Sequence, residues 1–250
     1  MDDQARQHTA KLLADADKTG RLLAALPEGN HIGSVAEAHA VQELVARLAG
    51  ETVVGWKVAI DAQEQSNWGG IYGRDTLASP ATVEQHRMPM MGVEGEIAFR
   101  FTADLPARQQ TYSREEIVAV LTPFPAIEVV DTRYANYQET PSLDRLADRM
   151  SNGGLVIGTA LPGADKVDLT QPHVVLKRNG EVLVDQVGGH VRKDPLLHVI
   201  AFINARQADT GFTKGQYITA GTYTGMPVGK PGERFEVSFD GIGSVSVTFV

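Results

Sequence analysis

The feature that most constrains the fold is a strictly alternating run, VEGEIAFRF, at residues 93–101. Val93, Ile97 and Phe99 occupy the odd positions, and Glu94 and Glu96 occupy even positions between them. Side chains of a β-strand point alternately to the two faces of a sheet. The run therefore predicts a strand with one apolar face and a second face on which two carboxylates lie roughly 6–7 Å apart along the strand.

Around this strand the sequence predicts a helical head followed by a β-rich body. Residues 1–50 are rich in Ala and Leu, and Ser34 with Glu37 forms a capping box for a helix that ends at Gly50. Further helices are predicted from Ser113 through Leu121, from Thr140–Pro141 to near Asn152, and from Asp194–Pro195 to about Ala205. Strands are predicted at 52–60, 93–101, 126–131 and 154–158. Two hairpins are predicted, with turns at Asn179–Gly180 and Asp240–Gly241. Residues 61–90 are predicted to be irregular, which is typical of a functional loop. Because strands and helices do not alternate regularly, the pattern favours an α+β fold over a doubly wound sheet.

Length and composition narrow the class of protein. A chain of 250 residues fits one large domain or two small ones. We predict a helical portion at 1–50 and a β-rich domain at 51–250, with one continuous domain as the alternative. The net charge is −8 and no Lys/Arg-rich block offsets it, which disfavours a nucleic-acid partner. The chain has no Cys, so disulfides, thiolate metal sites and Cys nucleophiles are excluded.

The sequence also predicts a cytoplasmic protein without a membrane partner. Its longest apolar runs are far shorter than the ~18–20 residues that a membrane span requires. The first residues, MDDQARQHTAK, are polar and begin with acids, unlike a secretory signal.

The chemistry of the chain is best indicated by three isolated acids and one lysine. No phosphate-binding loop, dinucleotide fingerprint, nucleophile elbow or HExxH motif occurs, and the seven His show no ligand spacing. Glu94 and Glu96 repel each other unless water solvates both or a cation neutralises them, and Mg²⁺ and Mn²⁺ prefer carboxylate ligands. Glu128 lies in the apolar segment PAIEVVD, where a buried carboxylate needs a partner. We predict that these three acids converge on one cation, with a solvated strand face as the alternative.

Lys57 is the unusual cation, because it lies inside the strand pattern VVGWKVAI. Its face otherwise carries the smaller side chains of Val53, Gly55 and Ala59, as expected of a strand that lines a cavity. We predict that Lys57 points into the same cavity as the three glutamates. The alternative is a lysine that extends into solvent.

Taken together, these segments resemble the hydratase/decarboxylase branch of the fumarylacetoacetate hydrolase superfamily, especially its hydratases of 2-hydroxy-alkadienoates. The resemblance covers nearly the whole chain. It rests on AHAVQ at 38–42, GWKVAI at 55–60, VEGEIAF at 93–99, PAIEVVDTR at 125–133, LADRMSNGGLVIG at 146–158, DPLLHVIAFIN at 194–204 and GIGSVSVTF at 241–249.

The resemblance implies a mixed β-roll catalytic body with an amino-terminal helical portion. It also implies a set of site residues. The implied metal ligands are Glu94, Glu96 and Glu128, which would hold Mg²⁺ or Mn²⁺. The implied catalytic residues are Lys57 and Asp75, the latter as the nearest candidate, in the segment Gly73–Asp75, for an acid expected in the hydratases. The implied substrate-binding residues are Asp148, Ser151 and Arg149. Arg149 departs from the family pattern, which usually has Asn there, and Ala220 departs in the segment ITAGTYTG.

The activity implied is addition of water to a 2-hydroxy-alkadienoate or unsaturated 2-oxo acid, giving a 4-hydroxy-2-oxo acid in the catabolism of aromatic ring-cleavage products. The metal would chelate the substrate's carboxylate and 2-oxo oxygens, and a partly buried Lys57 with a lowered pKa would carry protons. The implied partner is a small 2-oxo acid, and the chain is expected to form a homo-oligomer and to associate with another enzyme of its pathway.

Three alternatives remain open at this point. A 4-oxalocrotonate-type decarboxylase would use the same metal site but needs a further cation, for which Arg149, Arg74 and Arg133 are candidates. Hydrolysis of a C–C bond needs a water-activating base, and no motif supplies one. A non-catalytic partner subunit would keep the fold without needing the charged cluster.

Overall fold

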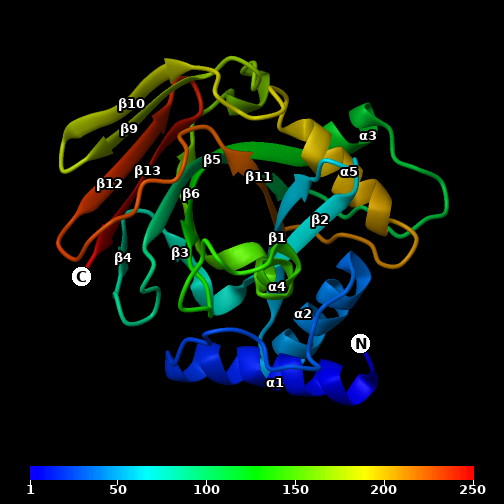
Figure 1. Ribbon diagram of the computed structural model, residues 1–250. Coiled ribbons are helices and arrows are strands. Elements are labelled where there is room, and N and C mark those ends of the chain that lie inside the picture. The colour runs from blue at the N-terminus through cyan, green and yellow to red at the C-terminus, as the bar shows by residue number, and fades with distance from the viewer.

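The computed structural model describes residues 1–250 and contains two β-sheets and five α-helices. The larger sheet has seven strands in the order β2-β1-β11-β5-β6-β7-β3 and curls into a half-barrel (Figure 1). Its strands are β1 (Val53–Ile60), β2 (Ser66–Tyr72), β3 (Thr76–Ala78), β5 (Gly92–Phe101), β6 (Leu121–Val130), β7 (Asn152–Ile157) and β11 (Tyr217–Thr222). Most pairs are antiparallel, but β1 with β11 and β3 with β7 are parallel, so the sheet is mixed.

The second sheet covers one side of the half-barrel (Figure 1). Its order is β10-β9-β12-β13-β4, and β8 pairs with β13 off this path. Its strands are β4 (Ala81–Val83), β8 (Thr159–Ala160), β9 (His173–Arg178), β10 (Glu181–Val187), β12 (Arg234–Phe239) and β13 (Gly243–Phe249). The largest apolar cluster joins the two sheets, with Ile97 and Phe99 of β5 in one cluster with Val237 of β12 and Val245 of β13. The apolar face predicted for β5 is therefore its core face.

The helices lie at the ends and edges of the sheets. They are α1 (Asp3–Thr19), α2 (Val35–Ala49), α3 (Arg114–Val118), α4 (Ser142–Ala147) and α5 (Leu196–Arg206), and three short 3₁₀ turns are η1 (Gly73–Asp75), η2 (Arg149–Ser151) and η3 (Ala164–Lys166). In Figure 1, α1 and α2 lie together at one end of the half-barrel and α4 lies near its opening. Ser34 caps α2 by accepting a hydrogen bond from the Glu37 backbone, and Gly50 ends it, as predicted.

The amino-terminal helices share a small core with a later part of the chain. Leu13 of α1 and Val41 of α2 belong to one buried cluster with Tyr134 and with Leu146 of α4. Residues 1–50 thus pack on the half-barrel through apolar contacts. The domain boundary at residue 50 stays a prediction.

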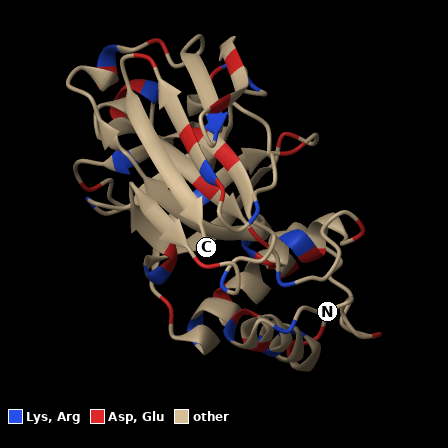
Figure 2. Ribbon diagram, turned by 90° about the vertical axis from the view of Figure 1, so that its left-hand side faces the viewer, with Lys and Arg blue, Asp and Glu red and all other residues tan.

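Charged residues are interspersed over both sheets and the helices and do not form one continuous basic stretch (Figure 2). No helix combines the length and apolar character needed to cross a membrane. The cytoplasmic location stays a prediction.

The α+β class and the mixed, curled sheet agree with the prediction, but the irregular segment predicted at 61–90 is wrong. It contains β2, β3 and β4. Strand β2, SNWGGIY, is buried over its last four residues and therefore lacks the polar alternation that reveals a half-exposed strand. Two predicted helices are also shorter: α3 ends at Val118 because Leu121 begins β6, and α4 ends at Ala147.

Helix α4 ends early because the chain enters a left-handed turn. Arg149, Met150 and Ser151 have φ values of 55°, 52° and 58°, in a region that non-glycine residues seldom adopt. Strand β2 approaches this turn at Gly69, where an added Cβ would lie 2.1 Å from the Arg149 backbone oxygen. The absence of a side chain at Gly69 therefore allows the turn to pack against the sheet.

We expect Gly69→Ala to lower the free energy of unfolding by about 1–3 kcal/mol, because the new methyl group must displace backbone atoms. Urea or thermal unfolding of the purified variant measures this. Gly70→Ala is the matched control, because its Cβ would meet only side-chain atoms at 3.4 Å or more. Equal stability of the two variants would contradict the tight approach.

Candidate functional site

Three glutamates meet on the inner face of the half-barrel. Strands β5 and β6 are antiparallel, and Glu94 is the direct partner of Glu128, while Glu96 lies two residues further along the same face of β5. One carboxylate oxygen from each residue lies within 4.8 Å of those of the other two. Glu96 and Glu128 are buried, and Glu94 is partly buried. The structure thus brings together the three acids that the sequence singled out.

The electrostatic environment of the three carboxylates favours binding of a cation. Burial raises the pKa of Glu94 to about 7, with Lys57 opposing the rise and Glu128 adding to it. Burial, followed by repulsion from Glu128 and Glu94, holds the pKa of Glu96 well above its ordinary value. Moreover, Oε2 of Glu128 is buried without a hydrogen-bond partner. An all-oxygen set with an unpartnered carboxylate oxygen fits a hard divalent cation such as Mg²⁺ or Mn²⁺.

Lys57 lies beside this cluster. Lys57 lies on β1, opposite Gly69 of β2 on one side and Thr219 of β11 on the other. Its Nζ is 2.7 Å from Oε1 of Glu128. Nδ2 of Asn152 donates to the same oxygen at 2.9 Å. The side chain of Lys57 is 15% exposed, so the alternative in which it extends into solvent is wrong.

The charge state of Lys57 differs from the one expected. Burial alone would lower the pKa of the ammonium group, but the carboxylates of Glu128, Glu94 and Glu96 reverse this and raise it. This direction is opposite to the lowered pKa expected from the sequence and applies to the protein without a bound cation. A divalent cation held by the glutamates would offset part of this stabilisation, since like charges repel.

A single peptide group connects two histidines to Glu96. His190 Nε2 and His198 Nδ1 lie 2.9 Å and 2.7 Å from the carbonyl oxygen of Ala220, and the N–H of the next residue, Gly221, donates to Oε2 of Glu96 at 3.1 Å. Burial lowers the pKa of both histidines, which favours neutral rings, each with one N–H to donate. Hydrogen bonds in such a chain polarise one another. The two rings therefore fix the peptide that orients Glu96.

This connection was missed from the sequence. The two histidines are far apart from Glu96 in the chain and make contact with it only through a backbone group. The signal in the sequence was a glycine, Gly221, inside the strand segment ITAGTYTG. In the structure its φ is 114°, which is accessible to glycine and strained for other residues.

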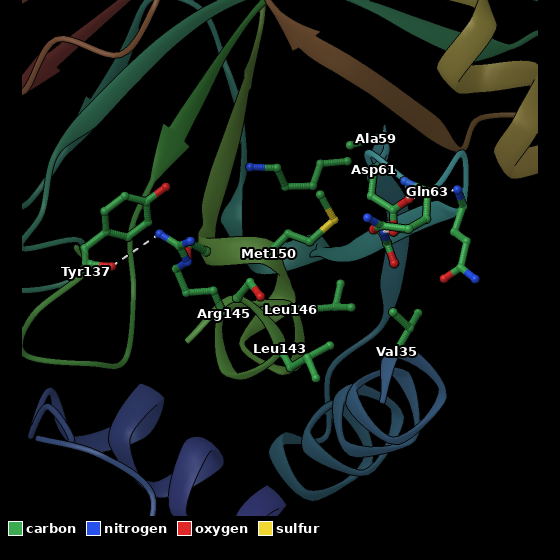
Figure 3. Close-up of a pocket in the computed structure, with 14 residues that line it drawn as sticks. Val35, Ala59, Asp61, Gln63, Tyr137, Leu143, Arg145, Leu146 and Met150 are labelled. Atoms are coloured by element: carbon green, nitrogen blue, oxygen red, sulfur yellow. Dashed lines mark hydrogen bonds between the residues drawn. The ribbon is translucent and has the colours of Figure 1, made fainter. Parts of the chain in front are cut away.

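Lys57 is one of the residues that line a cavity of about 510 Å³. The lining residues come from β1 and the turn after it, the start of β2, α2, the loop between β6 and α4, α4 and η2, and Figure 3 shows them around the cavity. They are Val35, Lys57, Ala59, Asp61, Gln63, Gln65, Asn67, Tyr137, Ser142, Leu143, Arg145, Leu146, Met150 and Ser151. Oγ of Ser151 is buried and has no hydrogen-bond partner. The cavity lining thus combines apolar side chains and amide groups with Lys57 and Ser151.

Two residues predicted for the site lie elsewhere. Asp75 pairs with Arg87 at 2.9 Å, and Arg149 pairs with Asp75 at 3.5 Å and with Asp17 of α1 at 3.2 Å. Asp75 and Arg149 line a separate charged cavity of about 770 Å³ next to α1. Neither lines the cavity beside Lys57.

The carboxylate of Asp148 is occupied by hydrogen bonds from neighbouring residues of the protein. Its carboxylate accepts hydrogen bonds from the side chain and the backbone N–H of Arg133 and from Oγ1 of Thr132. It lines neither of the two cavities. Of the three predicted substrate-binding residues, Ser151 is the one that faces the cavity beside Lys57.

The left-handed turn explains this division. It directs Arg149 to the charged cavity next to α1, whereas Met150 and Ser151 line the cavity beside Lys57. Three consecutive residues with positive φ are not foreseeable from a sequence without glycine at those positions.

The fold and this site define the class of the protein. The sequence model described as fumarylacetoacetate (FAA) hydrolase C-terminal matches residues 41–250. The chain belongs to the fumarylacetoacetate hydrolase family.

Particular relatives narrow the comparison. The chain is 30% identical over 257 residues to 2-keto-4-pentenoate hydratase 2 of Dechloromonas aromatica, covering 98% of this chain and 97% of the relative. It is 28% identical to 4-oxalocrotonate decarboxylase of Pseudomonas putida, over 86% of this chain and 85% of that enzyme. A solved structure of 4-oxalocrotonate decarboxylase from Pseudomonas putida G7, complexed with magnesium and adipate, superposes with a TM-score of 0.87 at 23% identity, covering 100% of this chain and 99% of that one.

We expect Glu96→Gln to weaken Mg²⁺ and Mn²⁺ binding by at least about tenfold while the fold survives, because an amide keeps the shape but loses the charge of a ligand. Titration calorimetry measures the affinity, and circular dichroism checks the fold. Glu181→Gln, at an exposed position of β10, is the control and should bind as the unaltered protein does. Unchanged metal affinity in Glu96→Gln would refute its role as a ligand.

Proposed function

We propose that the protein is a metal-dependent hydratase that adds water to a 2-hydroxy-alkadienoate or unsaturated 2-oxo acid and releases a 4-hydroxy-2-oxo acid. In this proposal it acts in the catabolism of aromatic ring-cleavage products. The observation that carries it is the group of three carboxylates within 4.8 Å of one another, with Lys57 between them and a cavity. The similarity to 2-keto-4-pentenoate hydratases over nearly the full length supports the same reaction.

The residues present suit this chemistry. Glu94, Glu96 and Glu128 would hold Mg²⁺ or Mn²⁺, which supplies Lewis acidity toward the carboxylate and 2-oxo oxygens of the substrate. Hydration moves a proton from the dienol oxygen to carbon and then adds the elements of water across the remaining double bond. Lys57 Nζ, at the wall of the cavity, is placed to hold or move such a proton. The buried hydroxyl of Ser151 is placed to donate to a substrate oxygen.

The decarboxylase is the second candidate, because one relative carries that activity in its name and the same metal site would serve. The three arginines expected from the sequence to bind its second carboxylate are already paired with acids, so a second carboxylate would need another cation. Arg149 pairs with Asp17 and Asp75, Arg74 with Asp17 and Glu51, and Arg133 with Asp148. A non-catalytic subunit is the less favoured candidate, because it would retain a buried cluster of like charges without a need for it.

Hydration and decarboxylation are distinguished by one assay. Purified protein, treated with chelator and reloaded with Mg²⁺ or Mn²⁺, is given unsaturated 2-oxo acids, and loss of ultraviolet absorbance and release of CO₂ are followed together. We expect metal-dependent loss of absorbance without CO₂. Release of CO₂ in step with loss of absorbance would establish the decarboxylase, and no turnover of any acid would support the non-catalytic subunit.

We expect Lys57→Ala to lower turnover by about 10²–10⁴, the usual contribution of a general acid–base group, with metal affinity little changed. Steady-state kinetics at saturating metal measure this. Lys177→Ala, in β9 of the second sheet, is the control and should retain full activity. If Lys57 only neutralises the carboxylates, metal affinity rises in the variant and turnover stays near normal.

Association into a homo-oligomer, or with another enzyme of the same pathway, stays a prediction. So does the identity of the metal used.

A further inference from the structure

Arg145 is the guanidinium group at the wall of the cavity beside Lys57. It comes from the last turn of α4 and lies partly buried beside Tyr137 (Figure 3). Its guanidinium carbon is 4.9 Å from the centre of the Tyr137 ring, and Nη1 donates a long hydrogen bond of 3.4 Å to the Tyr137 backbone oxygen. These two contacts hold the group in place but use few of its five N–H donors.

The charge of Arg145 has no partner in the protein. No carboxylate oxygen lies within 4.0 Å of its nitrogens, whereas Lys57 is paired with Glu128. The acid that lines the cavity, Asp61, accepts hydrogen bonds from the backbone N–H groups of Gln63 and Gln65 and from the Asn67 amide. Arg145 is therefore a cation at the cavity wall without an ion-pair partner, and a partly buried cation is stabilised by an anion that enters.

The cavity is also larger than the reacting end of a substrate requires. Apolar side chains of Leu143, Leu146 and Met150 lie on the same wall as Arg145, and Lys57 stands at the glutamate end. A volume of about 510 Å³ falls within the range of pockets that hold much larger ligands than a short 2-oxo acid. The space thus accommodates an acid with a carbon chain that extends past the lysine.

We propose that Arg145 binds a second carboxylate, at the far end of the substrate from the 2-oxo acid group, so that the preferred substrates are dicarboxylic unsaturated 2-oxo acids. This rests on the proposed function, because the 2-oxo acid end is assigned to the three glutamates and Lys57. The carbon chain lies against Leu143, Leu146 and Met150. The planar guanidinium fork matches a carboxylate with two parallel hydrogen bonds.

The test compares two unsaturated 2-oxo acids of equal length, one ending in a carboxylate and one in a methyl group. Wild-type protein should give a higher kcat/KM with the diacid. In Arg145→Gln we expect kcat/KM for the diacid to fall about 10–100-fold, the usual value of hydrogen bonds to charged groups, while that for the monoacid changes less than about threefold. Arg47→Gln, in the last turn of α2 and exposed, is the matched control.

A second measurement separates this proposal from the proposed function. Titration calorimetry with saturated 2-oxo acids, in the presence of Mg²⁺, reports binding without turnover. The diacid should bind wild-type protein more tightly than the monoacid, and Arg145→Gln should remove the difference. If wild type turns over neither acid, the proposed reaction is wrong and the calorimetric difference still decides the subsite. Equal effects of Arg145→Gln on both acids, or a wild-type preference for the monoacid, would overturn it.

Discussion

Repulsion among three carboxylates in the interior is the constraint on which the site depends. Glu94, Glu96 and Glu128 are fixed by the pairing of β5 with β6, and burial opposes the ionisation of Glu94 and Glu96. One lysine cannot balance three negative charges in a medium of low dielectric constant. The fold therefore preserves an arrangement that is unfavourable by itself and that a bound divalent cation would make favourable.

The surroundings of the cluster show how that arrangement is kept in place. Gly221 presents its N–H to Glu96, and the carbonyl of the same peptide group accepts from His190 and His198. On the other side of the site, the left-handed turn brings Ser151 to the cavity and packs on Gly69. The left-handed turn is a conformationally costly segment, and such segments persist where surrounding contacts determine them.

The sequence predicted the residues whose environment is encoded locally. Glu94, Glu96 and Lys57 were found because a strand has a period of two, and Glu128 because apolar residues flank it. The sequence did not predict β2, because a strand that is buried toward its end shows no polar–apolar alternation. It also did not predict the pairing of Asp75 with Arg149, because that pairing depends on a turn with unusual φ values. Arg145 was missed because a charge on a short helix normally faces solvent, and only tertiary packing against Tyr137 places it in a cavity.

The reacting groups and the groups that would select a substrate lie on different kinds of element. The three glutamates and Lys57 belong to central strands held on both sides by hydrogen-bonded neighbours, which keeps their geometry rigid. Arg145, Leu143 and Leu146 belong to α4, a short helix between the sheet and the amino-terminal helices. Substitutions on α4 would change the cavity wall without altering the strand register that places the three glutamates. This division is consistent with a family in which hydratases and decarboxylases share one fold and differ in what the cavity accepts.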